Sequence, residues 1–337
     1  MKRNQQAALA AGVLAAALGF GGCGWMSPAS SAPQPTPIPT ASSAQTSRLG
    51  LGVVAEAPGL AGTATASNTA AAVLLDETGH ILSIAVDMVH NKQSVDFDGA
   101  PKSYTPPLTA REQGDSYGLK NASTLGLEWY QQADNFQRYA AGMTVQQLEA
   151  LPLGADGKTT DVDLLAGCTI AVDDMVNAAI KACYNAQQAA PTAGQIAVLG
   201  MVSVSSQSRP ATDDADGLLQ LQTSIAAAAL DDSGQVSAAI CDEVQTSFGV
   251  DDDGEVSAPH RVFTKLEQGE EYGMKQASAI GKEWYQQSEA FSGWLAGRTA
   301  AGLTGISEQD ARADLAAGCT INMTNLLAAA IKAVQQK

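Results

Sequence analysis

The sequence predicts an α+β fold with two tandem homologous domains, each a small, largely antiparallel sheet with helices packed on one side. Three observations carry this prediction. The chain repeats itself: a shift of 155 residues superposes Tyr117–Thr144 on Tyr272–Thr299, with 15 of 28 residues identical and no gap. In each repeat, short apolar segments joined by acidic turns come first, and segments with helical spacing follow. Strands followed by helices are typical of α+β folds.

Each repeat is expected to begin with three strands. Asp-x-x-Gly turns join the second strand to the third, and Gly79 and Gly234 supply the positive φ that a tight hairpin needs. A second acidic turn ends in Gly99 or Gly254. The expected strands are 51–55, 69–75 and 81–86 in the first repeat and 197–204, 223–230 and 236–240 in the second.

The second acidic turn resembles half a calcium loop in the later repeat, Val250–Glu255. Gly249 and His260 stand where the opening Asp and the closing Glu of such a loop belong, so we interpret the segment as an acidic turn. The three histidines do not correspond between the repeats, which argues against a repeated metal site built on histidine.

Two helices are expected in each repeat. The first covers Tyr117–Ala141 or Tyr272–Ala296, and the second leads to the end of the repeat. Both copies of the first contain Glu-Trp-Tyr-Gln-Gln, in which the tryptophans are expected to anchor the core and the tyrosines to face elsewhere, available to a ligand ring. The tryptophans are Trp129 and Trp284, and the tyrosines are Tyr130 and Tyr285. The apolar stripe of the first helix in the first repeat consists of Ala122, Leu125, Trp129, Ala133, Phe136 and Ala140.

The N-terminus predicts export and lipidation. Lys2 and Arg3 precede a short apolar run that ends in Gly-Gly-Cys23, the pattern of a lipoprotein signal, with an ordinary signal peptide as the alternative. An acylated Cys23 would hold the chain on the extracytoplasmic face of the cell membrane. The predicted order is a signal peptide at 1–22, a disordered Ser/Ala/Pro/Thr-rich tether at 23–48, and domains at 49–187 and 195–337.

Charge and cysteine content narrow the possible partners. The formal net charge of −16 argues against nucleic acid, whose phosphates would repel the protein. An exported chain permits disulfides between Cys168, Cys183, Cys241 and Cys319. The positions equivalent to Cys183 and Cys241 hold valine, so we favour small buried thiols over a disulfide framework.

One short segment recurs before the last helix of each repeat. Asp163-Leu-Leu-Ala-Gly167-Cys-Thr169-Ile is echoed by Asp314-Leu-Ala-Ala-Gly318-Cys-Thr320-Ile. A threonine just before a helix can place its hydroxyl at the helix N-terminus, where phosphates bind. The simplest structural interpretation is a turn in which Asp accepts backbone hydrogen bonds and Thr caps the helix.

The segments resemble the flavinylation motif of the FMN-binding domain family, which occurs in the C and G subunits of sodium-pumping and Rnf-type redox complexes. That motif reads Asp-x-x-Ser/Thr-Gly-Ala-Thr. The Asp, Gly and final Thr match in both repeats, whereas Ala replaces the Ser/Thr and Cys replaces the Ala. The wider two-domain layout resembles exported lipoproteins of Gram-positive type.

The resemblance implies a cofactor and a partner. A flavin transferase would use FAD as donor, with a magnesium ion in the transferase, and would link FMN to Thr169 and Thr320 as phosphoesters. Asp163 and Asp314 would order the turn, and Gly167 and Gly318 would let the segment bend into the transferase. The protein would then be a lipid-anchored electron carrier more than a turnover enzyme, with redox partners that the sequence does not identify.

In a second interpretation the domains have the same fold but carry no covalent flavin. The Ala at 166 and 317 removes a hydroxyl from both motifs, which favours a surface binding or adaptor lipoprotein with Tyr130 and Tyr285 at its ligand surface. The retention of Thr169 and Thr320 in both copies favours the flavoprotein.

Overall fold

The computed structural model describes residues 46–60 and 62–336. The expected signal peptide, Cys23 and most of the tether lie outside these residues. Ser47 and Arg48, which the sequence places in the tether, belong to the folded part: the Ser47 amide donates to the carbonyl of Thr192 (2.8 Å), and Arg48 begins the first strand. No helix within the described ranges is long and apolar enough to cross a bilayer.

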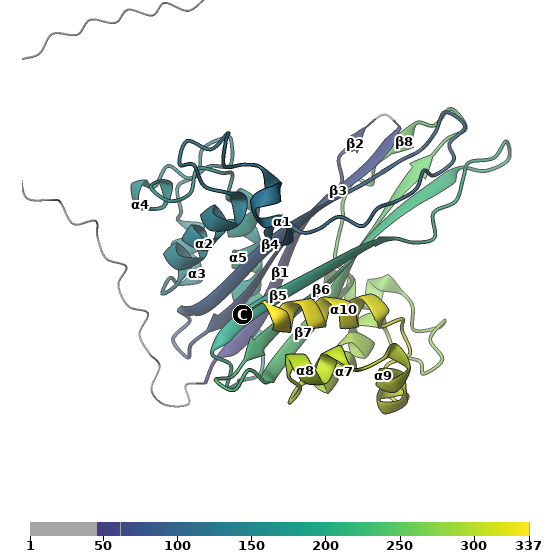
Figure 1. Ribbon diagram of the computed structural model, residues 1–337. Helices are drawn as coiled ribbons and strands as arrows, with labels where there is room; N and C mark the ends of the chain where they lie inside the picture. The colour runs from purple at the N-terminus through teal and green to yellow at the C-terminus, as the bar shows by residue number, and fades with distance from the viewer. Residues whose placement is uncertain (1–45, 61, 337) are drawn as a thin grey trace, which may run out of the picture. The chain divides into compact units, whose positions relative to one another are not determined.

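Each repeat contains a four-stranded antiparallel sheet, so the predicted α+β class is confirmed (Figure 1). In the first sheet β1 and β4 flank β3, and the short β2 pairs with the start of β3. The second sheet has the order β5-β6-β7-β8. The bounds are β1 Arg48–Glu56, β2 Gly59–Leu60, β3 Thr63–Leu75, β4 Ile81–Ser94, β5 Ile196–Ser205, β6 Gly217–Leu230, β7 Val236–Val250 and β8 Val256–Ser257.

The helices follow the strands in both repeats. In the first repeat they are α1 Ala110–Gln113, the 3-10 turn η1 Gly114–Tyr117, α2 Trp129–Ala140, α3 Val145–Glu149, α4 Val162–Leu165 and α5 Asp173–Gln188. In the second they are α6 Lys265–Gln268, η2 Gly269–Tyr272, α7 Trp284–Leu295, α8 Ala300–Thr304, α9 Glu308–Leu315 and α10 Thr324–Gln335.

The predicted helices at 117–141 and 272–296 are wrong in their first halves. Gly118 and Gly126 adopt φ values of 81° and 64°, which end one turn and begin another. Glu128 then caps α2, because its side chain and that of Gln131 bond reciprocally to the backbone. The expected stripe therefore loses Ala122 and Leu125 and keeps its later members, which are buried: Trp129, Ala133, Phe136 and Ala140.

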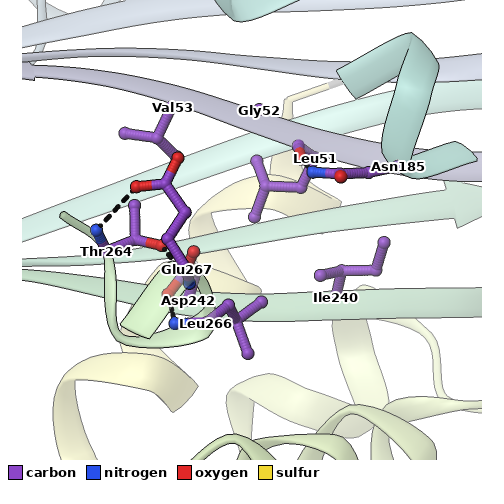
Figure 2. Close-up of a pocket in the computed structure, with 9 residues that line it drawn as sticks. All are labelled: Leu51, Gly52, Val53, Asn185, Ile240, Asp242, Thr264, Leu266 and Glu267. Atoms are coloured by element: carbon purple, nitrogen blue, oxygen red, sulfur yellow. Dashed lines mark hydrogen bonds between the residues drawn. The ribbon is translucent and has the colours of Figure 1, made fainter. Parts of the chain in front are cut away.

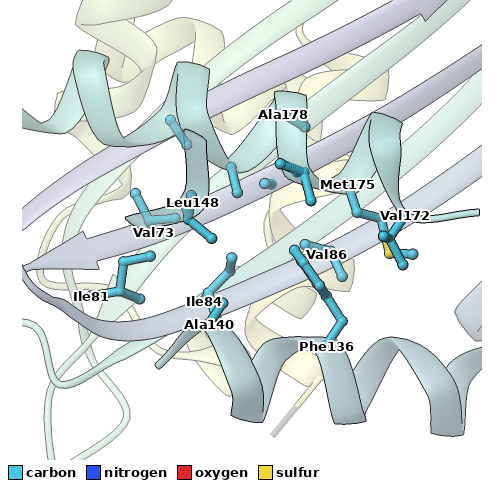
Figure 3. Close-up of a cluster of buried hydrophobic side chains, with 14 of the residues drawn as sticks. Val73, Ile81, Ile84, Val86, Phe136, Ala140, Leu148, Val172, Met175 and Ala178 are labelled. Carbon is cyan, nitrogen blue, oxygen red and sulfur yellow. The ribbon is translucent and has the colours of Figure 1, made fainter. Parts of the chain in front are cut away.

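The central strands are buried on both faces. Alternate residues of β3 point toward the helices of the same repeat, where they pack with Phe136 and Met175 (Figure 3), and toward the other sheet. Strand β6 alternates in the same way. The core between the sheets includes Leu49, Leu51, Ala70, Ala72 and Leu74 of the first repeat and Leu199, Met201, Ile225, Ala227 and Ala229 of the second.

Reciprocal contacts relate the two repeats by an approximate two-fold axis. Lys181 of α5 pairs with Glu267 of α6 at 2.7 Å, and their repeat equivalents Lys332 and Glu112 pair at 2.6 Å. Asn68 donates to the hydroxyl of Thr223 at 2.9 Å, and these residues lie one repeat length apart. Equivalent residues that touch each other must lie near the axis, as in a symmetric dimer interface.

A hollow of about 310 Å³ opens where β1 meets the second repeat (Figure 2). Its lining includes Val53 and Asn185 from the first repeat and Asp242, Thr264 and Glu267 from the second. It contains no residue of either threonine segment, so it does not contribute to the predicted site.

Helix α5 lies unusually close to β1. A Cβ atom built on Gly52 would come within 2.1 Å of the Ala178 carbonyl oxygen, and one on Gly50 within 1.9 Å of the Ala182 oxygen. In the second repeat, a Cβ atom built on Gly200 of β5 would likewise come within 2.1 Å of the Ala329 carbonyl oxygen of α10. Glycine is needed here for close approach, not for an unusual backbone angle.

A buried aspartate anchors the first helix of each repeat to its sheet. Oδ1 of Asp87 accepts the amides of Met88 (2.8 Å) and Arg111 (3.1 Å). Oδ1 of Asp242 accepts those of Glu243 (2.7 Å) and Leu266 (3.0 Å). Burial raises the pKa of Asp87 to about 6 and that of Asp242 to about 7, despite these hydrogen bonds.

We expect the raised pKa of Asp242 to make the protein less stable at neutral than at mildly acidic pH. The folded state favours the protonated carboxyl, so its stabilisation is complete below the unfolded-state value, near 4, and is lost as pH rises through about 7. The difference should be on the order of 3 kcal/mol. Urea unfolding at pH 5 and pH 7.5 measures it. Asp242→Asn should remove the larger part of the difference that the two anchoring aspartates contribute, with Asp87 supplying the remainder, and an unchanged difference would contradict the assignment.

Candidate functional site

The two candidate threonines lie in loops between short and long helices. Thr169 follows α4 and Thr320 follows α9, and in each case three residues separate the threonine from the next helix. Val172 and Met323 occupy the N-cap positions of α5 and α10 and make no side-chain cap. The interpretation of these threonines as helix caps is therefore wrong, and their hydroxyls are not at a helix N-terminus.

A buried glutamine holds each threonine instead. Oε1 of Gln132 in α2 accepts the backbone amide of Thr169 at 2.8 Å and its hydroxyl at 3.2 Å. Oε1 of Gln287 in α7 accepts the amide and the hydroxyl of Thr320 at 2.8 and 3.0 Å. Both glutamines are fully buried, and both threonines are half-buried. The loop is thus fixed in the same way in both repeats.

Each glutamine is itself held by two acceptors at its amide nitrogen. Nε2 of Gln132 donates to the Ser123 hydroxyl at 3.1 Å and to the Leu127 carbonyl at 3.2 Å. Nε2 of Gln287 makes the equivalent bonds to Ser278 and Lys282, both at 3.0 Å. The glutamines were not among the predicted site residues. The sequence signal that points to them is their presence in both copies of Glu-Trp-Tyr-Gln-Gln.

The aspartates of the motif lie in different surroundings. Asp163 is exposed in the first turn of α4, which Asp161 caps, and its carboxylate makes no hydrogen bond with another described residue. Asp314, near the end of α9, accepts the indole N–H of Trp294 at 2.9 Å. In neither repeat does the motif aspartate accept a backbone hydrogen bond from the loop.

The motif glycines let the loop approach the neighbouring helix. The carbonyl of Gly167 accepts from Nδ2 of Asn135 at 2.6 Å, and a Cβ at Gly167 would come within 2.9 Å of the Asn135 side chain. At Gly318 the nearest atom would be the Ala290 Cβ, at 3.1 Å. Neither glycine has a positive φ.

The cysteines are small buried thiols, as expected. All four described cysteines are free and buried. Burial raises the pKa of Cys168, next to Thr169, to about 11, so its thiol stays protonated and unreactive. Among the described residues, no group of three or more His, Cys, Asp or Glu side chains is arranged to hold a metal ion. The segment at 250–254 is an acidic turn, in which Oδ1 of Asp251 accepts two backbone amides.

An aromatic hollow lies beside the Thr169 loop. It has a volume of about 240 Å³ and includes Ile170 and Ala171, the two residues after Thr169. The rings of Tyr117 and Trp129 line it, with centroids 6.3 Å apart. Its remaining members are Thr69, Met88, Leu119, Asp173, Asp174 and Met175.

The lining fits a flavin ring and not a phosphate. Aromatic and apolar side chains suit a flat ring system, and the volume lies below the roughly 300–1,000 Å³ of pockets that enclose a whole drug-sized ligand. Asp173 and Asp174 would repel a phosphate inside the hollow. Burial, with the nearby charges of Glu56 and Asp173, raises the pKa of Asp174 to about 6. A phosphate on Thr169 would therefore lie outside the hollow.

The tryptophans of the repeated Glu-Trp-Tyr-Gln-Gln segments are buried in the core, as the sequence predicts, and the tyrosines beside them are only half-buried. Trp129 and Trp284 are both 3% exposed and anchor their cores. Tyr130 and Tyr285 are half-buried, and their hydroxyls donate to the acidic side chains of Asp115 (3.3 Å) and Glu270 (2.9 Å). Neither tyrosine lines the hollow beside Thr169, where Tyr117 takes that place.

Comparison with known proteins gives a distant and partial similarity to a reductase. The chain is 29% identical over 94 residues to a chlorophenol reductase from Desulfitobacterium hafniense. The match covers 24% of this chain and 29% of the relative, so it spans less than a third of the relative's length. No protein-family model and no solved structure matches the chain significantly.

Proposed function

We propose that this protein is a membrane-anchored extracytoplasmic electron carrier that bears covalent FMN on Thr169 and Thr320. The observation that carries the proposal is the identical placement of the two threonine hydroxyls, each on a buried glutamine. The distant similarity to a reductase supports a redox role. A bound flavin would supply the electron-transfer chemistry, and the chain would supply binding and orientation.

The hydroxyl geometry suits attack on phosphorus. Because Thr169 donates its hydroxyl proton to Gln132, the lone pairs of Oγ1 remain available to an incoming electrophile. In the attachment step, Oγ1 forms a bond to the FMN phosphorus of FAD and the pyrophosphate bond breaks. AMP leaves, and the hydroxyl proton passes to a base of the flavin transferase. The esterified oxygen has no proton left to donate, so the side chain must then turn away from Gln132.

A second candidate is a binding or adaptor lipoprotein without flavin. The carboxylates of Asp173 and Asp174 beside Thr169 favour it, because they oppose a phosphate nearby. In this case the aromatic hollow would take an uncharged or cationic group.

An intact mass measurement separates the two. Coexpression of the mature chain with a flavin transferase, with FAD supplied, should add one or two FMN-sized increments. Thr169→Ala combined with Thr320→Ala should abolish them, whereas Thr160→Ala, at an exposed threonine nearby, should have no effect. If the mass stays unmodified while the same transferase preparation flavinylates another substrate, the flavoprotein proposal is refuted.

A further inference from the structure

The aromatic pair beside Thr169 has a counterpart in the second repeat. Tyr117 and Trp129 correspond to Tyr272 and Trp284 at the repeat offset of 155 residues. The residues packed around the two pairs differ. In the first repeat the apolar Met88 lines the hollow of about 240 Å³ beside the rings, and the small Ala110 belongs to the same buried cluster without lining the hollow.

Charged side chains stand at both equivalent positions of the second repeat. Lys265 replaces Ala110 and Glu243 replaces Met88, and the two form a salt bridge. Lys265 is 6% exposed and Glu243 is 3% exposed. The pair is buried in the core, unlike the surface ion pairs of the fold.

The Lys265 ammonium occupies the space beside both rings. Its Nζ lies 4.8 Å from the centroid of the Tyr272 ring and 5.3 Å from that of Trp284, so both rings contact the cation. The Ser224 hydroxyl donates to Glu243 at 3.1 Å and holds the carboxylate in place. A flat ligand could enter only by displacing the ammonium, which would leave the Glu243 charge buried and unpaired.

We infer that the two repeats are unequal flavin sites, and that only the first docks a flavin ring against its aromatic pair. A flavin on Thr169 places its ring in the hollow beside Tyr117 and Trp129. A flavin on Thr320 finds the equivalent space filled by Lys265 and keeps its ring in solvent. The attachment part of this inference rests on the proposed function, and the docking part does not.

Fluorescence of the attached flavin tests the difference. Thr320→Ala leaves one flavin, on Thr169, and contact with the half-buried Tyr117, with Trp129 behind it, should make it several-fold dimmer than free FMN and protect it from iodide quenching. Thr169→Ala leaves one flavin, on Thr320, which should be as bright and as accessible as free FMN. Equal brightness and equal iodide accessibility of the two flavins would overturn the inference.

Exchanging the residues that differ between the two sites, 88 and 110 against 243 and 265, should exchange the fluorescence of the two attached flavins. Glu243→Met with Lys265→Ala, in the Thr169→Ala background, should open the second hollow and dim the flavin on Thr320. Met88→Glu with Ala110→Lys, in the Thr320→Ala background, should fill the first and brighten the flavin on Thr169. Ala110→Met, whose side chain would extend toward the rings as that of Lys265 does in the second repeat, fills the space without a charge and serves if the charged exchange does not fold. Flavin fluorescence that stays the same when the first hollow is filled and when the second is opened would contradict the assignment.

A probe that needs no attachment keeps the two proposals separable. In the Thr169→Ala, Thr320→Ala protein, lumiflavin, a flavin ring without the phosphate, should quench tryptophan fluorescence on titration. Ala110→Met should weaken that binding at least several-fold, and Glu243→Met with Lys265→Ala should add a second site. A chain that takes up no FMN but binds lumiflavin in this pattern refutes the attachment and supports the docking. Lumiflavin binding unchanged by Ala110→Met would refute the docking.

Discussion

Gly52→Ala should destabilise the protein by about 3 kcal/mol or more, because the added methyl group has no space. Its Cβ would lie 2.1 Å from the Ala178 carbonyl oxygen and 2.5 Å from the Ala182 amide nitrogen, both backbone atoms of α5. Backbone atoms within a helix cannot move aside singly, so α5 must shift off β1. Urea unfolding of the mature chain measures the loss.

The repeat and a second glycine supply the controls. Gly200→Ala, whose Cβ would meet the Ala329 oxygen at 2.1 Å, should cost about as much as Gly52→Ala. Gly293→Ala, inside α7 with no atom within 4 Å, should stabilise the protein by up to about 1 kcal/mol through helix propensity. Equal effects of Gly52→Ala and Gly293→Ala would show that α5 does not lie against β1 as described.

Lys265→Ala alone should cost about 3–5 kcal/mol of stability, because it leaves the Glu243 carboxylate buried without its partner. The added Glu243→Met should restore most of the loss, since the pair of substitutions reproduces the apolar residues of the first repeat. A double-mutant cycle from urea unfolding gives the coupling between the two sites. A double variant as unstable as Lys265→Ala would mean that the pair stabilises the core beyond cancelling its own charges.

Strand–turn–strand pairing and the core stripe of α2 could be predicted from the sequence because they depend on local patterns. Gly79 and Gly234 adopt φ values of 86° and 78°, as the Asp-x-x-Gly turns require. The expected strands were too short, however, by as much as ten residues in β7. The extensions carry polar residues such as Asn68 and Asn91, which are buried because their side chains donate hydrogen bonds to Thr223 of the other repeat. The polarity pattern of one repeat alone therefore cannot show that these residues are buried against the other repeat.

The motif placed both threonines ahead of the last helix of each repeat, as the structure has them, but the predicted helix cap is not what holds them. Thr169 and Thr320 occupy equivalent, half-buried positions, as the duplication implies. Their partners Gln132 and Gln287 lie 37 and 33 residues earlier, on a helix that the sequence placed but whose polar contacts it could not assign. The difference between Ala110 and Lys265 is visible when the two repeats are aligned, but its meaning depends on the position of the Lys265 ammonium beside the rings of Tyr272 and Trp284.

The shared core between the sheets gives the duplication a physical consequence. A single repeat would expose the sheet face that carries Leu51, Ala72 and Leu74. The same face of a second copy would cover it, as in a symmetric dimer. The molecule has the design of a homodimer whose subunits have been joined end to end. Joining keeps each half at a high effective concentration for the other, so the assembly survives dilution. It also frees the halves to diverge, since a substitution such as lysine at 265 need be tolerated only once.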